Sequence, residues 1–178
     1  MVRYRRNLVA GGTYFFTLTL ADRRASTLVD HIDSLRTAVA STRERLPFTI
    51  DAIVVLPEHL HAIMTLPEGD TDFSNRWSLI KRRFTDALTA TGVRLPRHRN
   101  EEAALWQRRF WEHTIRDDRD FERHVDYVHF NPVKHGLVGQ VRDWPHSSFH
   151  RYVRSGVLPA DWAGDFSEKQ TGFGERKG

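Results

Sequence analysis

The alternation of apolar and polar positions divides the first half of the chain into strands and helices. Residues 13–20 (TYFFTLTL) and 48–56 (FTIDAIVVL) are rich in β-branched and aromatic side chains, and each segment predicts a β-strand. Residues 59–66 (HLHAIMTL) predict a third strand, which follows a Pro-Glu connection and ends at a PEGD turn. Apolar residues recur near helical spacing over 29–45 and 72–90, so these two segments predict helices.

The second half of the chain predicts one further strand and one long helix. A strand is expected within residues 105–116 (LWQRRFWEHTIR), although the alternation there is poor. Residues 117–131 (DDRDFERHVDYVHFN) begin with acidic side chains that suit a helix N-terminus, and Pro132 should break this helix or start a short new one. The order βαββαβ with a late helix predicts an α+β fold, in which a ferredoxin-like or RRM-like antiparallel sheet carries its helices on one face.

Length and composition limit the organisation of the chain. The 178 residues suit one domain over 1–156, and the apolar-poor tail 157–178 should lie on the surface or be partly disordered. Cysteine is absent, which excludes a disulfide framework, a thiolate nucleophile and a cysteine-type zinc site. No apolar run approaches the roughly 20 residues that span a bilayer, and no signal peptide is evident. We therefore expect a cytoplasmic protein with no membrane partner.

The third predicted strand carries two histidines on the same face. Side chains alternate along a strand, so His59 and His61 project together, while the four even-numbered residues from 60 to 66 are apolar and project the other way. The apolar positions belong under the helices, which places the histidines on the opposite, more accessible face. Same-face neighbours lie about 7 Å apart, so two imidazoles can converge on one metal ion. The alternative is a satisfied structural histidine, because chance His-x-His pairs are common in a chain with ten histidines.

The late helix carries a polar stripe that includes a tyrosine. Asp120, His124, Tyr127 and Asn131 follow one another at spacings of four, three and four residues, so they share one helix face. A tyrosine in such a stripe is usually a surface residue, but a phenol also acts as a nucleophile when a metal or a base such as His124 helps to remove its proton. Asn131 could supply a metal ligand, or it could cap the helix before Pro132.

Basic side chains gather near aromatic residues in several segments. The chain has 27 Lys and Arg against 23 Asp and Glu, for a formal net charge of +4. Basic groups interleaved with flat rings are typical of a surface for single-stranded nucleic acid, whereas solvated helix faces and core aromatics are the alternative. The candidate DNA contacts are Arg3, Tyr4, Arg5, Arg6, Lys81, Arg82, Arg83, Arg108 and Arg109.

Three separated segments resemble a known family. They are residues 56–70 (LPEHLHAIMTLPEGD), 109–138 (RFWEHTIRDDRDFERHVDYVHFNPVKHGLV) and 143–153 (DWPHSSFHRYV). Together they resemble the REP-associated tyrosine transposases, which are relatives of the single-strand insertion-sequence transposases within the His-hydrophobic-His endonucleases. The resemblance covers nearly the whole chain, and the motifs occur in the family's order.

The resemblance implies a metal-dependent endonuclease and strand transferase that acts on single-stranded DNA at repetitive palindromic hairpins. His59 and His61 would bind a divalent metal, Mg²⁺ or Mn²⁺. Tyr127, on the late helix, would attack the DNA and form a 5′-phosphotyrosine intermediate. Asn131 would complete the metal site, although classical insertion-sequence members carry glutamine there. Residues 1–156 would form the catalytic DNA-binding domain, working as a monomer or a homodimer and associated with the nucleoid when bound to DNA.

Two functions of other classes would explain parts of the pattern. A non-catalytic RRM-like nucleic-acid-binding module would account for the basic and aromatic residues, but it predicts exposed aromatics on the sheet face. A zinc metallohydrolase would account for His59 and His61, but it needs further ligands and gives Tyr127 no role.

Overall fold

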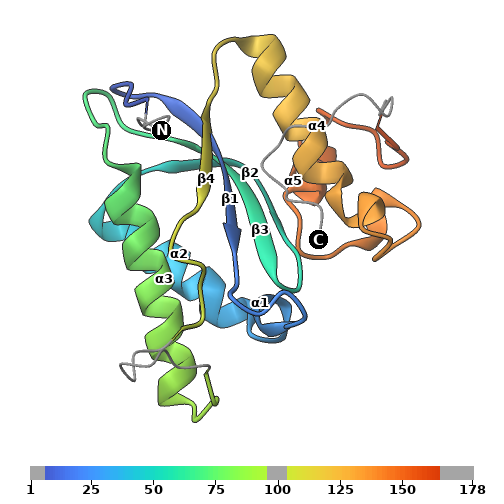
Figure 1. The fold of residues 1–178 in the computed structure, drawn as a ribbon. Helices are drawn as coiled ribbons and strands as arrows, with labels where there is room; N and C mark the ends of the chain where they lie inside the picture. The colour runs from blue at the N-terminus through green and yellow to red at the C-terminus, as the bar shows by residue number, and fades with distance from the viewer. Residues whose placement is uncertain (1–6, 96–103, 165–178) are drawn as a thin grey trace, which may run out of the picture.

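The computed structural model describes residues 7–95 and 104–164. A four-stranded antiparallel sheet lies at the centre, with the strand order β2-β3-β1-β4 (Figure 1). The strands are β1 (Thr13–Thr19), β2 (Thr49–Val55), β3 (His59–Thr65) and β4 (Trp111–Thr114). The predicted α+β fold with an antiparallel sheet is confirmed, and each predicted strand is present.

Five α-helices and one 3₁₀ turn are described. They are α1 (Thr27–Asp30), α2 (Ile32–Arg45), α3 (Phe73–Ala90), α4 (Asp118–Lys134), η1 (Val141–Asp143) and α5 (Phe149–Arg154). The helix expected over 29–45 is divided at His31 into α1 and α2. As predicted, α4 begins with acidic residues, and its N-cap Asp117 accepts a hydrogen bond from the Asp120 N–H over 2.8 Å.

The prediction that Pro132 breaks the late helix is wrong. Pro132 lies inside α4, which continues to Lys134. Proline so near the end of a helix removes one backbone hydrogen bond but leaves the following turn intact, and the His135 N–H donates to the Asn131 carbonyl over 3.0 Å. The chain leaves the helical path at Gly136, whose φ of 68° suits a residue without a Cβ.

Helices cover both faces of the sheet. On one face α2 and α3 pack over a core that includes Tyr14, Phe16 and Trp77. On the other face lies α4 (Figure 1), which packs against a cluster that includes Phe15. The expectation that all helices share one face is therefore wrong for α4. Phe15 and Phe16 are consecutive and both 0% exposed, so β1 is buried on both faces and needs cover on each.

The tail predicted over 157–178 is described as far as residue 164. Residues 157–164 run along the surface, where Trp162 lies against Phe149 with ring centroids 6.0 Å apart. The rest of the predicted tail lies outside the described residues. Within 7–95 and 104–164, no helix is both long and apolar enough to cross a membrane.

Candidate active site

Strand β3 places His59 and His61 side by side beneath α4. Their ring centroids are 4.9 Å apart, and the ring planes meet at 80°. The expectation that this face is accessible is wrong, because His59 is 2% and His61 0% exposed. The covering helix α4 packs across β2 and β3 and encloses the pair. The pairing of the two histidines on one face, which their spacing predicted, is present.

Each histidine is held at Nδ1 by a neighbouring side chain. His59 Nδ1 lies 2.8 Å from Glu58 Oε1, and His61 Nδ1 lies 2.8 Å from Thr17 Oγ1. Burial opposes ionisation of Glu58, but the hydrogen bond to His59 and the charge of Arg23 hold the pKa of this carboxyl below its ordinary value. A polar partner on one ring nitrogen is the usual support of a metal-binding histidine, because it fixes the ring and the tautomer. A metal at this pair would therefore bind at Nε2.

Helix α4 brings Tyr127 against the histidine pair. The Tyr127 ring lies 5.2 Å from the His61 ring and 5.8 Å from the Phe15 ring, centroid to centroid. Tyr127 is 2% exposed, so the phenol belongs to the buried group and not to the helix surface. The candidate nucleophile and the candidate metal ligands, 66 residues or more apart in sequence, thus share one site.

Two residues of the site, one beside Tyr127 and one beside His59, were not predicted from the sequence. Lys134 Nζ donates a hydrogen bond to Tyr127 Oη over 3.1 Å and lies 4.7 Å from the ring centroid. The His135 ring lies 5.1 Å from the His59 ring. The signal for Lys134 was its spacing, since a residue seven positions after Tyr127 is two turns on along the same face. Because the helix was expected to break at Pro132, Lys134 was not placed on the same helix face as Tyr127.

Asn131 lies one turn beyond Tyr127 and is 0% exposed. The helix ends at Lys134 and its C-cap residue is His135, so Asn131 is an interior residue of α4 and caps neither end. The capping interpretation is therefore wrong. The role of Asn131 as a third metal ligand stays a prediction.

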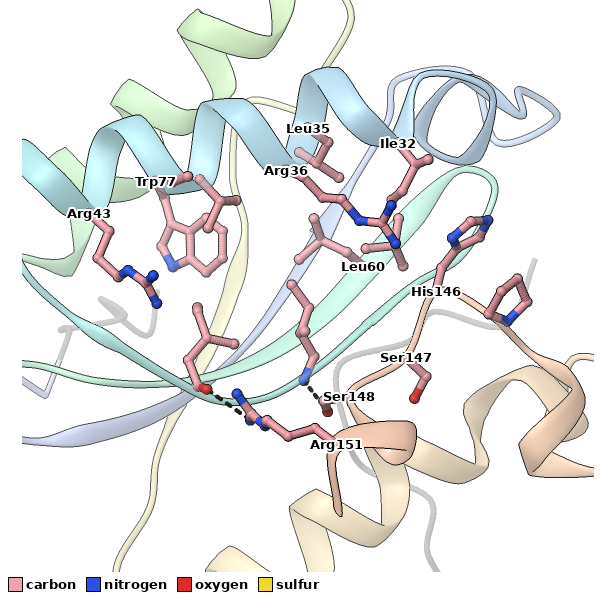
Figure 2. Close-up of a pocket in the computed structure, with 16 residues that line it drawn as sticks. Ile32, Leu35, Arg36, Arg43, Leu60, Trp77, His146, Ser147, Ser148 and Arg151 are labelled. Atoms are coloured by element: carbon pink, nitrogen blue, oxygen red, sulfur yellow. Dashed lines mark hydrogen bonds between the residues drawn. The ribbon is translucent and has the colours of Figure 1, made fainter. Parts of the chain in front are cut away.

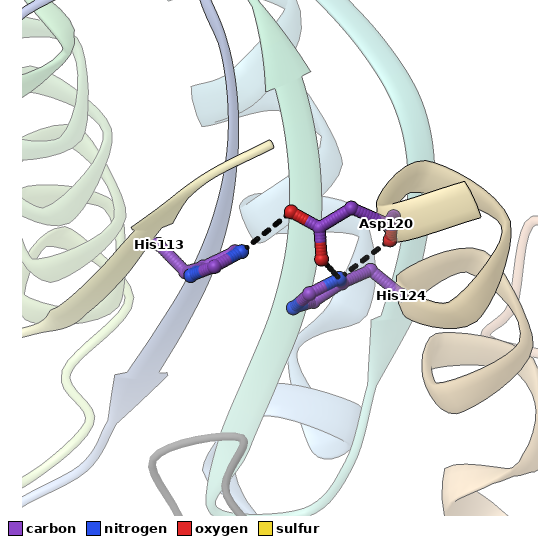
Figure 3. Close-up of side chains that lie close together, drawn as sticks. All are labelled: His113, Asp120 and His124. Atoms are coloured by element: carbon purple, nitrogen blue, oxygen red, sulfur yellow. Dashed lines mark hydrogen bonds and ion pairs between the residues drawn. The ribbon is translucent and has the colours of Figure 1, made fainter. Parts of the chain in front are cut away.

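His124 belongs to a second polar group, together with His113 and Asp120 (Figure 3). His113 Nε2 lies 2.8 Å from Asp120 Oδ2, and His124 Nδ1 lies 3.3 Å from Asp120 Oδ1 and 2.7 Å from the Asp120 carbonyl. Burial lowers the pKa of His124 to about 4, so its ring is neutral at pH 7. One ligand atom from each residue lies within 4.8 Å of the others, so this His-Asp-His group could hold a metal ion.

The predicted DNA-binding residues fall into three groups. Arg3, Tyr4, Arg5 and Arg6 lie outside the described residues. Lys81 Nζ donates to the Gln107 carbonyl over 2.8 Å and Arg83 to Ser41 Oγ over 2.8 Å, so both hold parts of the fold together. Burial also lowers the pKa of Lys81. The side chains that project into solvent are those of Arg82, Arg108 and Arg109.

A cavity of about 370 Å³ lies away from this site, on the face covered by α2 (Figure 2). Apolar side chains that include Leu35 and Trp77 line it, and Arg36, Arg43 and Arg151 stand around it. None of the predicted catalytic or metal-binding residues lines this cavity. The candidate chemistry is therefore in the polar group beneath α4 and not in this cavity.

The fold and the site together define a His-hydrophobic-His protein with a tyrosine beside its histidine pair. The chain is 49% identical over 172 residues to the REP-associated tyrosine transposase of Escherichia coli K12, and the match covers 97% of each chain. It is 47% identical over 167 residues to a Haemophilus influenzae protein assigned to the same family, which covers 93% of this chain and 95% of that one. A solved structure of a REP-associated tyrosine transposase bound to a REP hairpin matches with a TM-score of 0.87 and 48% identity over 99% of both chains. No protein-family model matches. The chain belongs to the REP-associated tyrosine transposases, as its motifs predicted.

Proposed function

We propose that this chain cleaves and rejoins single-stranded DNA beside palindromic hairpins, through a covalent bond between Tyr127 and a DNA 5′-phosphate. The observation that carries the proposal is the buried contact between Tyr127 and His61, whose ring centroids are 5.2 Å apart. That contact puts a candidate nucleophile directly beside candidate metal ligands. The solved relative bound to a REP hairpin supports hairpin DNA as the substrate class.

The donor set fits a divalent cation. His59 and His61 would bind it through Nε2, because Glu58 and Thr17 engage the other ring nitrogens. Asn131 would add an amide oxygen, and this oxygen, together with phosphate and water, makes Mg²⁺ or Mn²⁺ suitable where imidazoles alone would favour zinc. When bound, the cation would withdraw charge from the scissile phosphate and orient it.

Tyr127 would form the new bond to phosphorus. As the phenol loses its proton, its oxygen attacks the phosphorus and the bond from phosphorus to the 3′ oxygen breaks. The 3′ oxygen takes up a proton, and a strand with a free 3′-OH leaves. Lys134 would stabilise the negative charge on the attacking oxygen, to which it already donates. A second 3′-OH can then attack the phosphotyrosine, which restores the phenol and joins a new strand. This reversal makes one residue sufficient for both cutting and joining.

The basic residues would hold the DNA backbone. Arg82, Arg108 and Arg109 are exposed and would contact phosphates, while Arg3, Arg5 and Arg6 would lie near a short recognition sequence. Affinity for a single strand should fall by roughly 0.7 log units per log unit of salt for each phosphate neutralised. A salt-independent affinity would exclude this basic surface as the main contact.

The protein would act in the cytoplasm as a monomer or a homodimer.

A covalent-adduct assay tests the proposal. The wild-type chain and Tyr127→Phe are incubated with a DNA hairpin that carries a single-stranded flank, with Mn²⁺ or with EDTA, and run on a denaturing gel. We expect a metal-dependent protein–DNA adduct that Tyr127→Phe lacks, because phenylalanine keeps the buried ring and removes only the nucleophilic oxygen. Binding without any adduct would favour the RRM-like module. Metal-dependent hydrolysis without an adduct would favour the metallohydrolase.

A further inference from the structure

The His-Asp-His group of His113, Asp120 and His124 connects two elements of the fold. His113 comes from the short strand β4, while Asp120 and His124 come from the first turns of α4 (Figure 3). Asp120 and His124 are 5% and 3% exposed, so the connection is mostly shielded from water. The two imidazole rings stack with centroids 4.6 Å apart and an interplanar angle of 14°, which aligns their edges toward the same carboxylate.

This group is separate from the histidine pair near Tyr127. His61 belongs to β3 and His113 to β4, and β1 runs between these strands. Adjacent strands lie about 4.8 Å apart, so the two backbones are separated by roughly 10 Å across the sheet. The Phe15 ring from β1 contacts both groups, with centroids 5.5 Å from His61 and 4.9 Å from His124. Two ions would therefore be needed to occupy both groups.

We propose that His113, Asp120 and His124 bind a second divalent ion, of the Zn²⁺ or Co²⁺ type, which fastens α4 to β4. Two imidazoles and one carboxylate form a donor set that such borderline ions prefer and that Mg²⁺ does not. Ligand atoms around tetrahedral zinc lie about 3.4 Å apart. The 3.3 Å from His124 Nδ1 to Asp120 Oδ1 is close to that value, and the 2.8 Å from His113 Nε2 to Asp120 Oδ2 would lengthen as the ion enters. One ligand atom from each of the three residues lies within 4.8 Å of the others.

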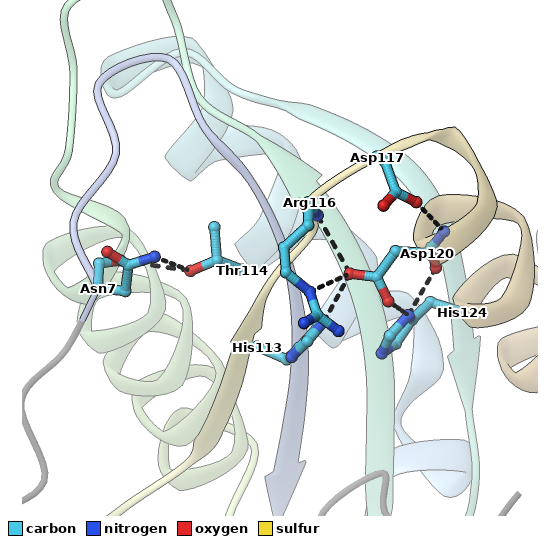
Figure 4. Close-up of polar contacts among 7 residues, drawn as sticks. All are labelled: Asn7, His113, Thr114, Arg116, Asp117, Asp120 and His124. Carbon is cyan, nitrogen blue, oxygen red and sulfur yellow. Dashed lines mark hydrogen bonds and ion pairs between the residues drawn. The ribbon is translucent and has the colours of Figure 1, made fainter.

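Binding would replace hydrogen bonds that the group already makes. The ion would displace the proton between His113 and Asp120. His124 Nδ1 now donates to the Asp120 carbonyl, so its proton would move to Nε2 when Nδ1 binds the ion. The Arg116 N–H and Nε also donate to Asp120 Oδ2, over 3.1 and 3.4 Å (Figure 4). A carboxylate has about four acceptor positions, so Asp120 can keep the Arg116 N–H while it binds an ion. The exposed Arg116 side chain can move into solvent.

A binding experiment on variants isolates this site. The double variant His59→Gln/His61→Gln removes the candidate cleavage-metal ligands, so its metal binding does not depend on the proposed activity. After EDTA treatment it is titrated with Co²⁺, and the visible d–d absorption and the number of bound equivalents are recorded. Adding His113→Phe gives the matched control, because phenylalanine keeps a flat ring between Trp111 and His124, whose rings stack on His113.

We expect one equivalent of Co²⁺ in the double variant and none after His113→Phe is added. Zn²⁺ should raise the melting temperature of the double variant but not that of the triple variant. If the double variant does not fold, the wild type and His113→Phe are compared instead. The wild type should then bind one equivalent of Co²⁺ more than His113→Phe. An equal number of equivalents in each pair would overturn the proposal, and the group would then be a hydrogen-bonded brace without metal.

Discussion

Replacing Lys134 with methionine should slow DNA cleavage and leave hairpin affinity nearly unchanged. The Lys134 ammonium donates to Tyr127 Oη over 3.1 Å, so it lies where charge develops on an attacking phenol oxygen. Methionine keeps most of the length of the side chain and its packing on the ring but cannot carry charge. The variant therefore tests the charge at this position with little change in shape.

The size of the effect follows from the distance and the exposure of Lys134. At 3.1 Å two unit charges interact by about 1.3 kcal/mol in bulk water and by about 5 kcal/mol at an effective dielectric constant of about 20. Lys134 is an exposed residue, so solvent screening keeps the interaction energy between its charge and the phenol oxygen near the bulk-water value, at about 1.5 to 2.5 kcal/mol. Because about 1.4 kcal/mol corresponds to a factor of ten, cleavage should slow by about 10- to 70-fold.

Single-turnover cleavage of a hairpin with a single-stranded flank, at saturating Mn²⁺, measures this change. Lys134→Arg should retain most of the rate, because it keeps a donor and a charge. Arg119→Met is the matched control, since Arg119 is an exposed cation in the first turn of the same helix. A Lys134→Met rate equal to that of Arg119→Met would refute the reasoning, and Lys134 would then be a packing residue only.

Three further predictions each concern one buried side chain. Thr17→Val removes the hydroxyl that lies 2.8 Å from His61 Nδ1, so calorimetric titration should show about 10- to 100-fold weaker Mn²⁺ binding. An unchanged Mn²⁺ affinity would show that Thr17 does not orient His61 for metal binding. Arg76 is 2% exposed and donates to the Pro47 carbonyl over 2.7 Å. Arg76→Met should therefore lower the free energy of unfolding, measured by urea titration, by about 2–4 kcal/mol. An unchanged urea midpoint would contradict this prediction. Burial lowers the pKa of His129 from 6.5 to about 3, so the unfolded chain binds this proton first and stability falls as the pH drops through that window. As the pH falls from 6.5 to about 3, the melting temperature of His129→Gln should therefore fall less than that of the wild type. Equal falls in the two melting temperatures would show that other groups dominate the pH dependence.

The sequence predicted the elements of the fold because local patterns define them. Strands β1, β2 and β3 have alternating or β-branched residues, and Asp117 supplies a cap that fixes the start of α4. The pairing of His59 with His61 on one face follows from the geometry of any strand. These features depend on residues near each other in the chain, so an alternation pattern is sufficient to predict them.

The burial of the site could not be predicted in the same way. The odd positions of β3 carry polar rings, which suggested an exposed face, but α4 returns from more than 50 residues further along the chain and covers them. Another strand indicated this cover, because the consecutive Phe15 and Phe16 of β1 require burial on both faces. The His-Asp-His group depends on the pairing of Phe15 with His113 across β1 and β4, and the poor alternation of β4 did not reveal which face His113 occupies.

The burial of the histidine pair determines what a substitution there can demonstrate. His59 and His61 are almost inaccessible and pack against aromatic rings, so alanine would leave a cavity and cost stability as well as any metal ligand. Loss of activity in His61→Ala would not separate the two causes. Glutamine approximates the volume of the ring and can keep a hydrogen bond to Thr17. A His61→Gln variant with wild-type melting temperature and no adduct would thus assign the loss to the metal site, whereas a full adduct would show that His61 only supports the core.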